Sequence, residues 1–298
     1  MYKIWSRDPR EQQLDELLTG DRGDQQDKPQ LNADRPGSMF ANSSHLKFVN
    51  SQFLVANSIH YHTWNTNDVS PIQNWLKAPD PSTNFVAACD KRTPGTGDWI
   101  CSHSQYTQWC RGKPGILWIQ GKVGSGKTVL SAAIIEDLQI NPAVMCCYYY
   151  FDNRDNLKMK TNARGLLQSL LLQMATRTEG VHPALHELYT KCKGVMKPTT
   201  KDLSATLAAV AKDLSPVFLV LDAMDECSET IDVFKHLAHL KKNLYIAVTS
   251  RYLAETSYEA SWHIHLDDTE SFRRDVARYL QDKLSHRKLK PRAVQRNS

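Results

Sequence analysis

The sequence predicts an α/β protein built around a parallel β-sheet, and two observations support this fold class. From residue 116 onward, short apolar runs alternate with segments whose apolar residues recur at helical spacing, which is typical of strands alternating with helices. In addition, Val217–Leu221 is apolar at every position, as expected of a strand that is buried on both faces of a parallel sheet. We therefore expect a helix-flanked parallel sheet from this point to about Leu284.

The strands are expected where apolar and β-branched residues form short runs. Ile116–Gln120 comes first and directly follows a glycine- and proline-rich turn. Trp262–Leu266 comes last and alternates between polar and apolar residues, as a half-exposed strand does. The complete set of expected strands is Ile116–Gln120, Val144–Phe151, Val217–Leu221, Leu244–Thr249 and Trp262–Leu266.

The helices are expected where apolar residues share one face. Lys127–Gln139 carries Leu130, Ile134 and Leu138 at four-residue spacing, and Asn162–Thr176 places its leucines on one side. The expected helices are Lys127–Gln139, Asn162–Thr176, Pro183–Lys191, Asp202–Leu214, Ile231–Leu240 and a final amphipathic helix around Phe272–Leu284.

Two further segments precede this core, and one follows it. Residues 1–70 form a poorly ordered region or linker, because Gly20–Gly37 is rich in Asp, Gln, Gly and Pro and has almost no large apolar residue to bury. Residues 71–115 form a helical lead-in, with helical spacing at Ile72–Leu76 and Ser104–Trp109 around turn-rich stretches at 80–84 and 95–99. Residues 116–284 are the core, and residues 285–298 are a basic tail.

Composition excludes several classes of protein. Of 298 residues, 41% are hydrophobic and 23% are charged, which is ordinary for a soluble globular protein, and the net charge of +5 does not by itself argue for an anionic partner. No basic and aromatic stripe suggests nucleic-acid binding. The longest apolar stretches are far shorter than the roughly 20 residues of a membrane span, and the N-terminus has no secretory signal.

Cysteine usage points to a reducing compartment. The seven cysteines are odd in number and include no C-x-x-C pair, which argues against a disulfide framework and a structural zinc site. We therefore expect reduced thiols and a cytoplasmic location.

A complete phosphate-loop motif lies between the first expected strand and the first expected helix of the core. It matches G-x-x-x-x-G-K-[ST] and consists of Gly121, Lys122, Val123, Gly124, Ser125, Gly126, Lys127 and Thr128. Glycines let backbone N–H groups wrap a phosphate, and the helix that follows places its positive N-terminus against the anion. In this motif Lys127 contacts the β- and γ-phosphates, and the hydroxyl group of Thr128 completes Mg²⁺ coordination. The strand before the loop and the helix after it favour this interpretation over a glycine-rich turn without a ligand.

An acidic cluster follows the most apolar strand. Asp222 ends that strand, where its carboxylate would hold Mg²⁺ from the strand beside the loop. Asp225 and Glu226 follow, and they could polarise the attacking water or position the group that does. We favour Glu226 as the catalytic base. The motif Thr249-Ser250-Arg251 follows the next strand, so that Arg251 is either a contact for the γ-phosphate or a surface arginine.

These motifs together resemble the NACHT class of signal-transducing (STAND) P-loop NTPases. The lead-in segment is more particular: Asp80-Pro81-Ser82-Thr83-Asn84, Gly95-Thr96-Gly97-Asp98-Trp99 and Trp109 resemble the segment before the phosphate loop in fungal NACHT proteins, many of which carry ankyrin repeats. Those proteins belong with the nephrocystin-3-like N-terminal domain. The resemblance covers about Pro71–Leu284.

The resemblance implies a five-stranded parallel sheet with the phosphate-loop strand and the acidic strand adjacent. It also implies ATP or GTP as ligand, and a nucleotide-driven switch that controls homo- or hetero-oligomerisation through the core. In fungal members this switch is linked to non-self recognition and programmed cell death. Members usually continue into helical and winged-helix lids and a repeat sensor, so we expect a truncated or minimal member.

Two main hypotheses follow, and a third fits less well. The first is a Mg²⁺-dependent nucleoside-triphosphate switch with slow hydrolysis, hence an NTPase. The second is a non-catalytic module that nucleotide only stabilises and that pairs with full-length relatives. A small-molecule P-loop kinase is disfavoured, because the acids Asp225 and Glu226 suit a water better than an acceptor alcohol. The sequence does not distinguish adenine from guanine.

Overall fold

The structure of the protein is a computed structural model, and it describes residues 69–177, 180–214, 216–240, 244–252 and 260–288. All of them belong to one compact unit that runs from His62 to Ser298. The predictions for residues 1–68 and 289–298 therefore lie outside the described residues, and the proposed domain limits stay predictions.

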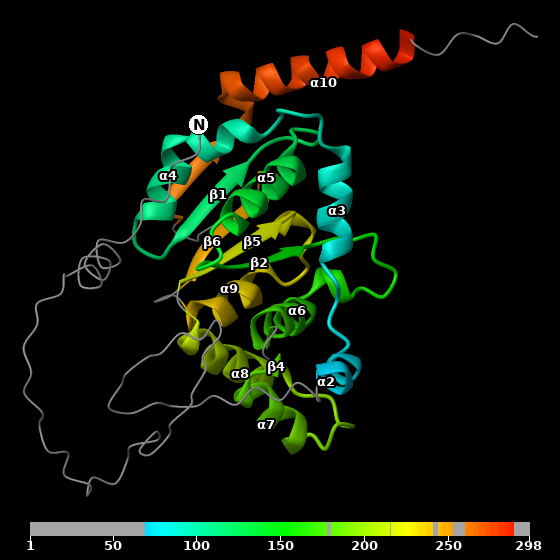
Figure 1. Ribbon diagram of the computed structural model, residues 1–298, viewed down its shortest axis with the longest axis vertical. Coiled ribbons are helices and arrows are strands. Elements are labelled where there is room, and N and C mark those ends of the chain that lie inside the picture. The colour runs from blue at the N-terminus through cyan, green and yellow to red at the C-terminus, as the bar shows by residue number, and fades with distance from the viewer. Residues whose placement is uncertain (1–68, 178–179, 215, 241–243, 253–259, 289–298) are drawn as a thin grey trace, which may run out of the picture. The chain divides into compact units, whose positions relative to one another are not determined.

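Five parallel strands form the central sheet in the order β2-β5-β6-β1-β7 (Figure 1). In the register, Tyr150 lies opposite Asp222, and Gln120 lies opposite Ser250. The carboxyl ends of the strands therefore meet at one edge of the sheet, and the predicted α/β fold class with a five-stranded parallel sheet is confirmed. The strands are β1 (Ile116–Gln120), β2 (Met145–Tyr150), β5 (Val217–Asp222), β6 (Leu244–Ser250) and β7 (Trp262–His265).

The expectation that the phosphate-loop strand and the acidic strand are adjacent is wrong. Strand β6 lies between β1 and β5 and pairs with both of them. Every residue of β6 except Tyr245 is buried, which is consistent with a central position in the sheet. By contrast, β7 exposes His263 and His265 and forms an edge of the sheet.

Helices cover both faces of the sheet, and alternate residues of each strand point to opposite layers. On β1, Trp118 packs into a core formed mainly with α6, α8 and α9, whereas Leu117 and Ile119 pack into a core formed with α4 and α5. Helix α3 packs on α5. The helices are α2 (Val69–Leu76), α3 (Ser82–Lys91), α4 (Ser104–Arg111), α5 (Lys127–Gln139), α6 (Ala163–Ala175), α7 (Pro183–Lys191), α8 (Thr200–Asp213), α9 (Thr230–Ala238) and α10 (Glu270–Lys288).

Most predicted boundaries agree with the structure to within one or two residues, and the differences have local causes. Helix α8 begins earlier than predicted because Thr199 and Asp202 form a capping box. Helix α3 begins inside the stretch interpreted as a turn. There the carboxylate of Asp80 accepts hydrogen bonds from the backbone N–H and the hydroxyl group of Ser82, both at 2.8 Å. The short antiparallel pair β3 (Thr176–Arg177) and β4 (Gly180–Val181) was not predicted, since two-residue strands carry no periodic signal.

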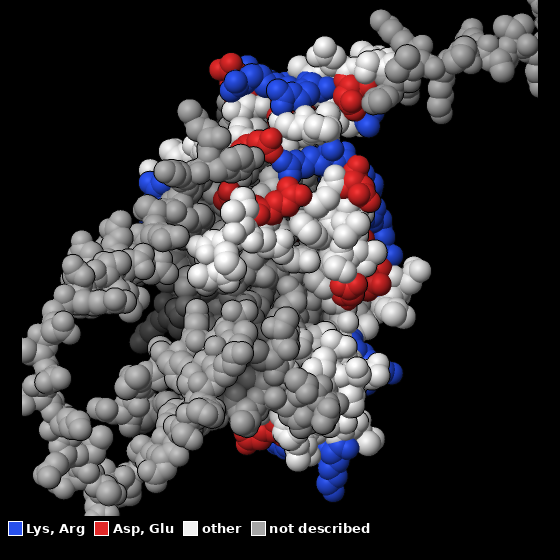
Figure 2. Space-filling view, viewed as in Figure 1, with Lys and Arg blue, Asp and Glu red and all other residues white. Residues whose placement is uncertain are grey.

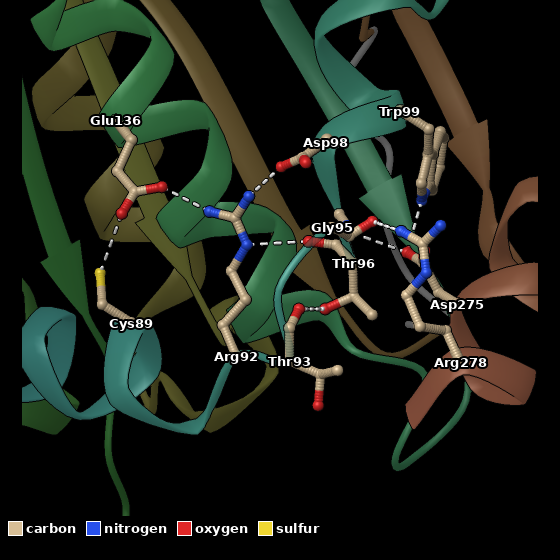
Figure 3. Close-up of polar contacts among 11 residues, drawn as sticks. Cys89, Arg92, Thr93, Gly95, Thr96, Asp98, Trp99, Glu136, Asp275 and Arg278 are labelled. Carbon is tan, nitrogen blue, oxygen red and sulfur yellow. Dashed lines mark hydrogen bonds and ion pairs between the residues drawn. The ribbon is translucent and has the colours of Figure 1, made fainter. Parts of the chain in front are cut away.

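The loop between α3 and α4 is held between α5 and α10 (Figure 3). The guanidinium group of Arg92 forms ion pairs with Asp98 in the loop and with Glu136 on α5. On the other side, the carboxylate of Asp275 on α10 accepts a hydrogen bond from the indole N–H of Trp99 at 2.8 Å. These contacts fix the chain just before helix α4, which leads into the strand that carries the phosphate loop.

Helix α10 is longer at both ends than the predicted Phe272–Leu284. Four apolar side chains on it, Val276, Tyr279, Leu280 and Leu284, are between 38% and 57% exposed. Figure 2 shows Lys and Arg side chains gathered along the same helix. The predicted amphipathic helix is therefore present, but its apolar side chains are only partly covered by the described residues.

Within the described ranges, no helix is both long and apolar enough to cross a membrane.

Candidate functional site

The phosphate loop connects the carboxyl end of β1 to the N-terminus of α5, as the sequence predicts. Gly124 and Gly126 both have φ of +77°, a conformation that favours glycine, and a Cβ atom added at either position would meet no atom within 4 Å. At Gly121, an added Cβ atom would lie 2.6 Å from the hydroxyl oxygen of Ser125. The loop therefore needs glycine at position 121 because a side chain there would clash with Ser125. It needs glycine at positions 124 and 126 because the backbone there has a positive φ, and the space beside both residues is open.

The side chain of Lys127 folds back over the loop. Its Nζ atom donates hydrogen bonds to the carbonyl oxygens of Gly121 at 2.8 Å and Lys122 at 2.7 Å, and a longer one to Ser125 at 3.4 Å. Burial lowers the pKa of Lys127 below its ordinary value, although Asp225 and Asp222 act in the opposite direction. The ammonium group is thus held among loop oxygens at the mouth of the loop.

The carboxylate of Asp222 is buried at the end of β5 and is bonded to three hydroxyl groups. Thr128 donates to it at 2.8 Å and Ser131 at 2.7 Å, both from α5, while Thr249 donates at 2.6 Å from β6. Burial raises the pKa of Asp222 above its ordinary value, although the three hydroxyl donors act to lower it. The strand order explains this network, because β6 supplies Thr249 from between the loop and the acidic strand.

Asp225 and Arg251 form a pair on the same edge of the sheet. The backbone N–H of Arg251 donates to the carboxylate of Asp225 at 2.8 Å, and its guanidinium group also bonds to that carboxylate. This contact raises the pKa of Arg251 above its ordinary value. The side chain of Asp225 is only 7% exposed, so its carboxylate is occupied by the neighbouring strand end rather than open to solvent.

Glu226 contacts the loop that follows β2. One of its carboxylate oxygens accepts a hydrogen bond at 2.9 Å from the backbone N–H of Asn153, in the loop after β2. Glu226 also lines a cavity of about 450 Å³ whose wall includes Thr128 and Asp222. Of the two acids that follow Asp222, Glu226 is therefore the one that shares an open space with the phosphate-loop threonine.

The structure brings most of the predicted site residues to one edge of the sheet. Lys127, Thr128 and Asp222 lie together, while Asp225 and Arg251 bind each other beside them. Lys122 and Val123 belong to the loop, but their side chains are 79% and 78% exposed, so they contribute through the backbone. Across the described ranges, no group of three or more His, Cys, Asp or Glu side chains could hold a metal ion. The oxygen atoms of Thr128 and Asp222 are the donors available beside the loop.

Sequence reasoning missed several residues that complete this edge. Ser131 lies almost one helical turn after Thr128, so its position on α5 was a usable signal. Asn153 and the basic residues of the loop after β2 carry no motif. They reach the site only because β2 pairs with β5, which places the end of β2 beside Asp222.

A protein-family model supplies the decisive comparison. The family described as "Nephrocystin 3, N-terminal" matches residues 95–251, which is just over half of the chain. The chain belongs to this family. The match begins in the loop that Arg92 and Asp275 hold, includes the phosphate loop and the Asp222 strand, and ends at Arg251. At the level of the family, membership indicates a nucleotide-binding P-loop domain.

A curated relative agrees with this family assignment. The vegetative incompatibility protein HET-E-1 of Podospora anserina is 25% identical over 135 residues, which are 43% of this chain and 10% of that protein. The match thus spans only about a tenth of the relative. Together with the family match, it confirms the predicted resemblance to NACHT-class domains of the nephrocystin-3-like type.

Among solved structures, one similar chain comes from the structure of Drosophila ORC bound to DNA. It is 14% identical with a TM-score of 0.37, covering 59% of this chain and 44% of that chain. The fold assignment rests on the sheet and its helices rather than on this likeness.

Proposed function

We propose that this nephrocystin-3-like domain binds ATP or GTP together with Mg²⁺ and acts as a NACHT-type signalling switch with slow hydrolysis. The observation that carries the proposal is the hydrogen bond of 2.8 Å between the hydroxyl group of Thr128 and the carboxylate of Asp222. It joins the end of the phosphate loop to the end of the acidic strand, although β6 separates their strands. Mg²⁺ prefers hard oxygen ligands, and the hydroxyl group of Thr128 and the carboxylate of Asp222 offer such oxygen atoms beside the phosphate loop.

The loop itself supplies the phosphate-binding groups. Lys127 donates to two loop carbonyl oxygens, and in the complex its ammonium group would donate to the β- and γ-phosphate oxygens instead. The open space beside Gly124 and Gly126 leaves room for an anion against the backbone of the loop and the N-terminus of α5. These features support the binding of a phosphate chain, but they do not determine which nucleobase is bound.

When bound, Mg²⁺ supplies positive charge that neutralises the phosphate oxygens, and Thr128 and Asp222 would hold it. Ser131 and Thr249 then serve to orient the carboxylate of Asp222, because both donate to the same oxygen atom of that group. The donor set fits the ion, since a hydroxyl group and a carboxylate meet at the mouth of the loop.

Glu226 is the residue that we propose as the base that positions water. It shares a cavity with Thr128 and Asp222, whereas Asp225 is occupied by Arg251. We further propose that Arg251 reports on nucleotide state by exchanging Asp225 for the γ-phosphate, and that this exchange drives homo- or hetero-oligomerisation through the core. The odd number of cysteines and the absence of a C-x-x-C pair in the sequence support a cytoplasmic site of action.

A thermal-shift titration tests the proposal as a whole. ATP, GTP and their diphosphates are added with and without Mg²⁺, and the melting temperature of the protein is recorded. A ligand that binds only the folded state at a hundred times its Kd adds about 2.7 kcal/mol of stability, which is readily measured. We expect stabilisation by at least one triphosphate, larger with Mg²⁺. No shift with any nucleotide at millimolar concentration would refute the proposal.

A substitution at Glu226 tests hydrolysis separately from binding. Glu226→Gln keeps an oxygen atom for the N–H of Asn153 but removes the basic carboxylate. We therefore expect unchanged triphosphate affinity and a turnover rate that falls by about 100-fold or more. Single-turnover phosphate release measures the rate, and Asp232→Asn on α9 serves as a matched control for the loss of one negative charge. Unchanged release by the Glu226 variant would assign the base elsewhere. A wild-type rate no higher than that of a Lys127→Ala variant would instead favour a non-catalytic interaction module.

A further inference from the structure

A cavity beside the phosphate loop contains charged residues that the proposed nucleotide site does not use. Its volume is about 450 Å³, and it lies between α3, the end of β2 and the end of β5. Three basic residues line it: Lys91 from α3, and Arg154 and Lys160 from the loop after β2. Thr128 and Asp222 form part of the same wall, so the cavity is continuous with the mouth of the phosphate loop.

The acidic residues of this cavity already have partners. Asp152 accepts hydrogen bonds from the backbone and the guanidinium group of Arg154, and Glu226 accepts one from the backbone of Asn153. Asp222 is bonded to three hydroxyl groups. The positive charge of Arg154 is therefore matched by Asp152, while Asp222 and Glu226 keep the roles proposed for them at the nucleotide site.

Two of the basic residues, in contrast, have no direct contact with a carboxylate, although Lys160 is near enough to Asp80, Asp152 and Asp155 to act to lower the pKa of each. Within the part of the chain that the structure describes, neither Lys91 nor Lys160 forms an ion pair. The ammonium group of Lys160 donates a hydrogen bond at 2.6 Å to the neutral amide oxygen of Asn84 on α3, which leaves two of its three donors for a ligand. Figure 2 shows basic side chains among acidic ones along the edge formed by α3 and the loop after β2.

A buried hydroxyl group in the same wall also needs a partner. Tyr150 is only 2% exposed, and its hydroxyl group has no hydrogen-bond partner among the described residues. Leaving a buried hydroxyl group unpaired is unfavourable, and such groups usually bind water or a ligand. Tyr150 lies opposite Asp222 in the register of β2 and β5, so a polar ligand beside Asp222 is within its neighbourhood.

We propose that this cavity is a subsite for a tetrahedral oxyanion, bound by Lys160 and Lys91 with Tyr150 as a further donor. Two sources share this chemistry: free inorganic phosphate, and the terminal phosphoryl group of a triphosphate on the loop. The second source rests on the proposed nucleotide binding, whereas the first does not. Because an oxyanion accepts several hydrogen bonds at once, it satisfies the free donors of two lysines and one phenol together.

The first experiment measures inorganic phosphate binding in a Lys127→Ala background, where the phosphate loop is disabled. Phosphate is titrated against sodium chloride of equal ionic strength, and the melting temperature is recorded. We expect phosphate to stabilise this protein, and Lys160→Gln in the same background to weaken binding about tenfold. Glutamine keeps a donor for Asn84, and Lys201→Gln on α8 is the charge-matched control, because Lys201 is exposed outside the cavity. Binding that Lys160→Gln leaves unchanged, or no binding at all, would overturn the subsite.

The second experiment tests the phenol and identifies the source of the anion. Tyr150→Phe removes only the hydroxyl group, so we expect an unchanged or higher melting temperature without phosphate and a few-fold weaker phosphate affinity. A lower melting temperature with unchanged phosphate affinity would remove Tyr150 from the subsite. In the Lys127-containing protein, Lys160→Gln should lower the affinity for a non-hydrolysable triphosphate but not for the diphosphate if the terminal phosphoryl group occupies the cavity. Equal effects on both nucleotides, with phosphate binding still lost, would assign the cavity to free phosphate.

Discussion

Lys127→Ala is expected to weaken triphosphate binding by about 100-fold or more while the protein stays folded. Lys127 would make two charge-assisted hydrogen bonds to phosphate oxygens, each of which contributes about 1.5–3 kcal/mol. In the structure the same ammonium group only donates to loop carbonyl oxygens and is half-buried at the surface of the site, so its loss leaves no core contact broken. Isothermal titration calorimetry with ATP and GTP measures the affinity, and circular dichroism confirms the fold.

The matched control for this variant lies in the same loop. Lys122→Ala removes an identical charge, but the Lys122 side chain is 79% exposed and lies 3.8 Å from the carboxylate of Asp267. Because a solvent-exposed ion pair of this kind contributes about 1 kcal/mol or less, we expect a change in nucleotide affinity of only a few-fold. Equal triphosphate affinity for the Lys127 variant and the wild type would refute the nucleotide-binding proposal, whatever the result for Lys122→Ala.

Most helices and strands of this fold could be predicted because they have a strong local signal. The helix Lys127–Gln139 shows its period in Leu130, Ile134 and Leu138, and the predicted and observed bounds agree. Helix α3 was harder, because its first turn, Ser82-Thr83-Asn84, is polar and looks like a turn until the contact with Asp80 is seen. The contact between the side chain of Asp80 and Ser82 marks the start of this helix, and a hydropathy pattern does not reveal such a contact.

The order of the strands could not be derived from local patterns. Both β5 and β6 are almost continuously apolar, so either could lie beside β1 as far as burial is concerned. Only the pairing shows that β6 is between the loop and the acidic strand. This error concerned more than topology, because it hid the role of Thr249, which reaches Asp222 from the inserted strand.

The candidate site was predictable as far as motifs extend. The phosphate loop and Asp222 were identified from residue types at fixed spacing, and the structure places Thr128 and Asp222 in contact. Tyr150 and Lys160 have no motif, since a single lysine in a loop and a tyrosine in a strand are common in any sequence. Their position at the site depends on the pairing of β2 with β5 and on the packing of α3, which are long-range features.

Asp222→Asn is expected to remove the Mg²⁺ dependence of nucleotide binding without lowering the stability of the protein in the absence of nucleotide. The carboxylate is buried, and burial raises its pKa, which means that the ionised form is unfavourable where it lies. Asparagine has the same shape and no charge. Its oxygen atom can still accept from Ser131 and Thr249, and its amide can donate to the hydroxyl oxygen of Thr128, which rotates to accept.

The comparison with Asp222→Ala separates charge from hydrogen bonding. Alanine leaves three hydroxyl groups without their acceptor, so we expect unfolding free energy to fall by on the order of 3 kcal/mol in urea denaturation. Asparagine should leave that free energy unchanged or raise it, yet the Mg²⁺-dependent gain in nucleotide affinity should fall about tenfold or more, because the hard cation loses a charged oxygen ligand. An Asn variant that keeps the full Mg²⁺ effect would show that the metal is held elsewhere. If it were instead as unstable as the Ala variant, the negative charge itself would be required for folding, with the nearby ammonium group of Lys127 as its compensating cation.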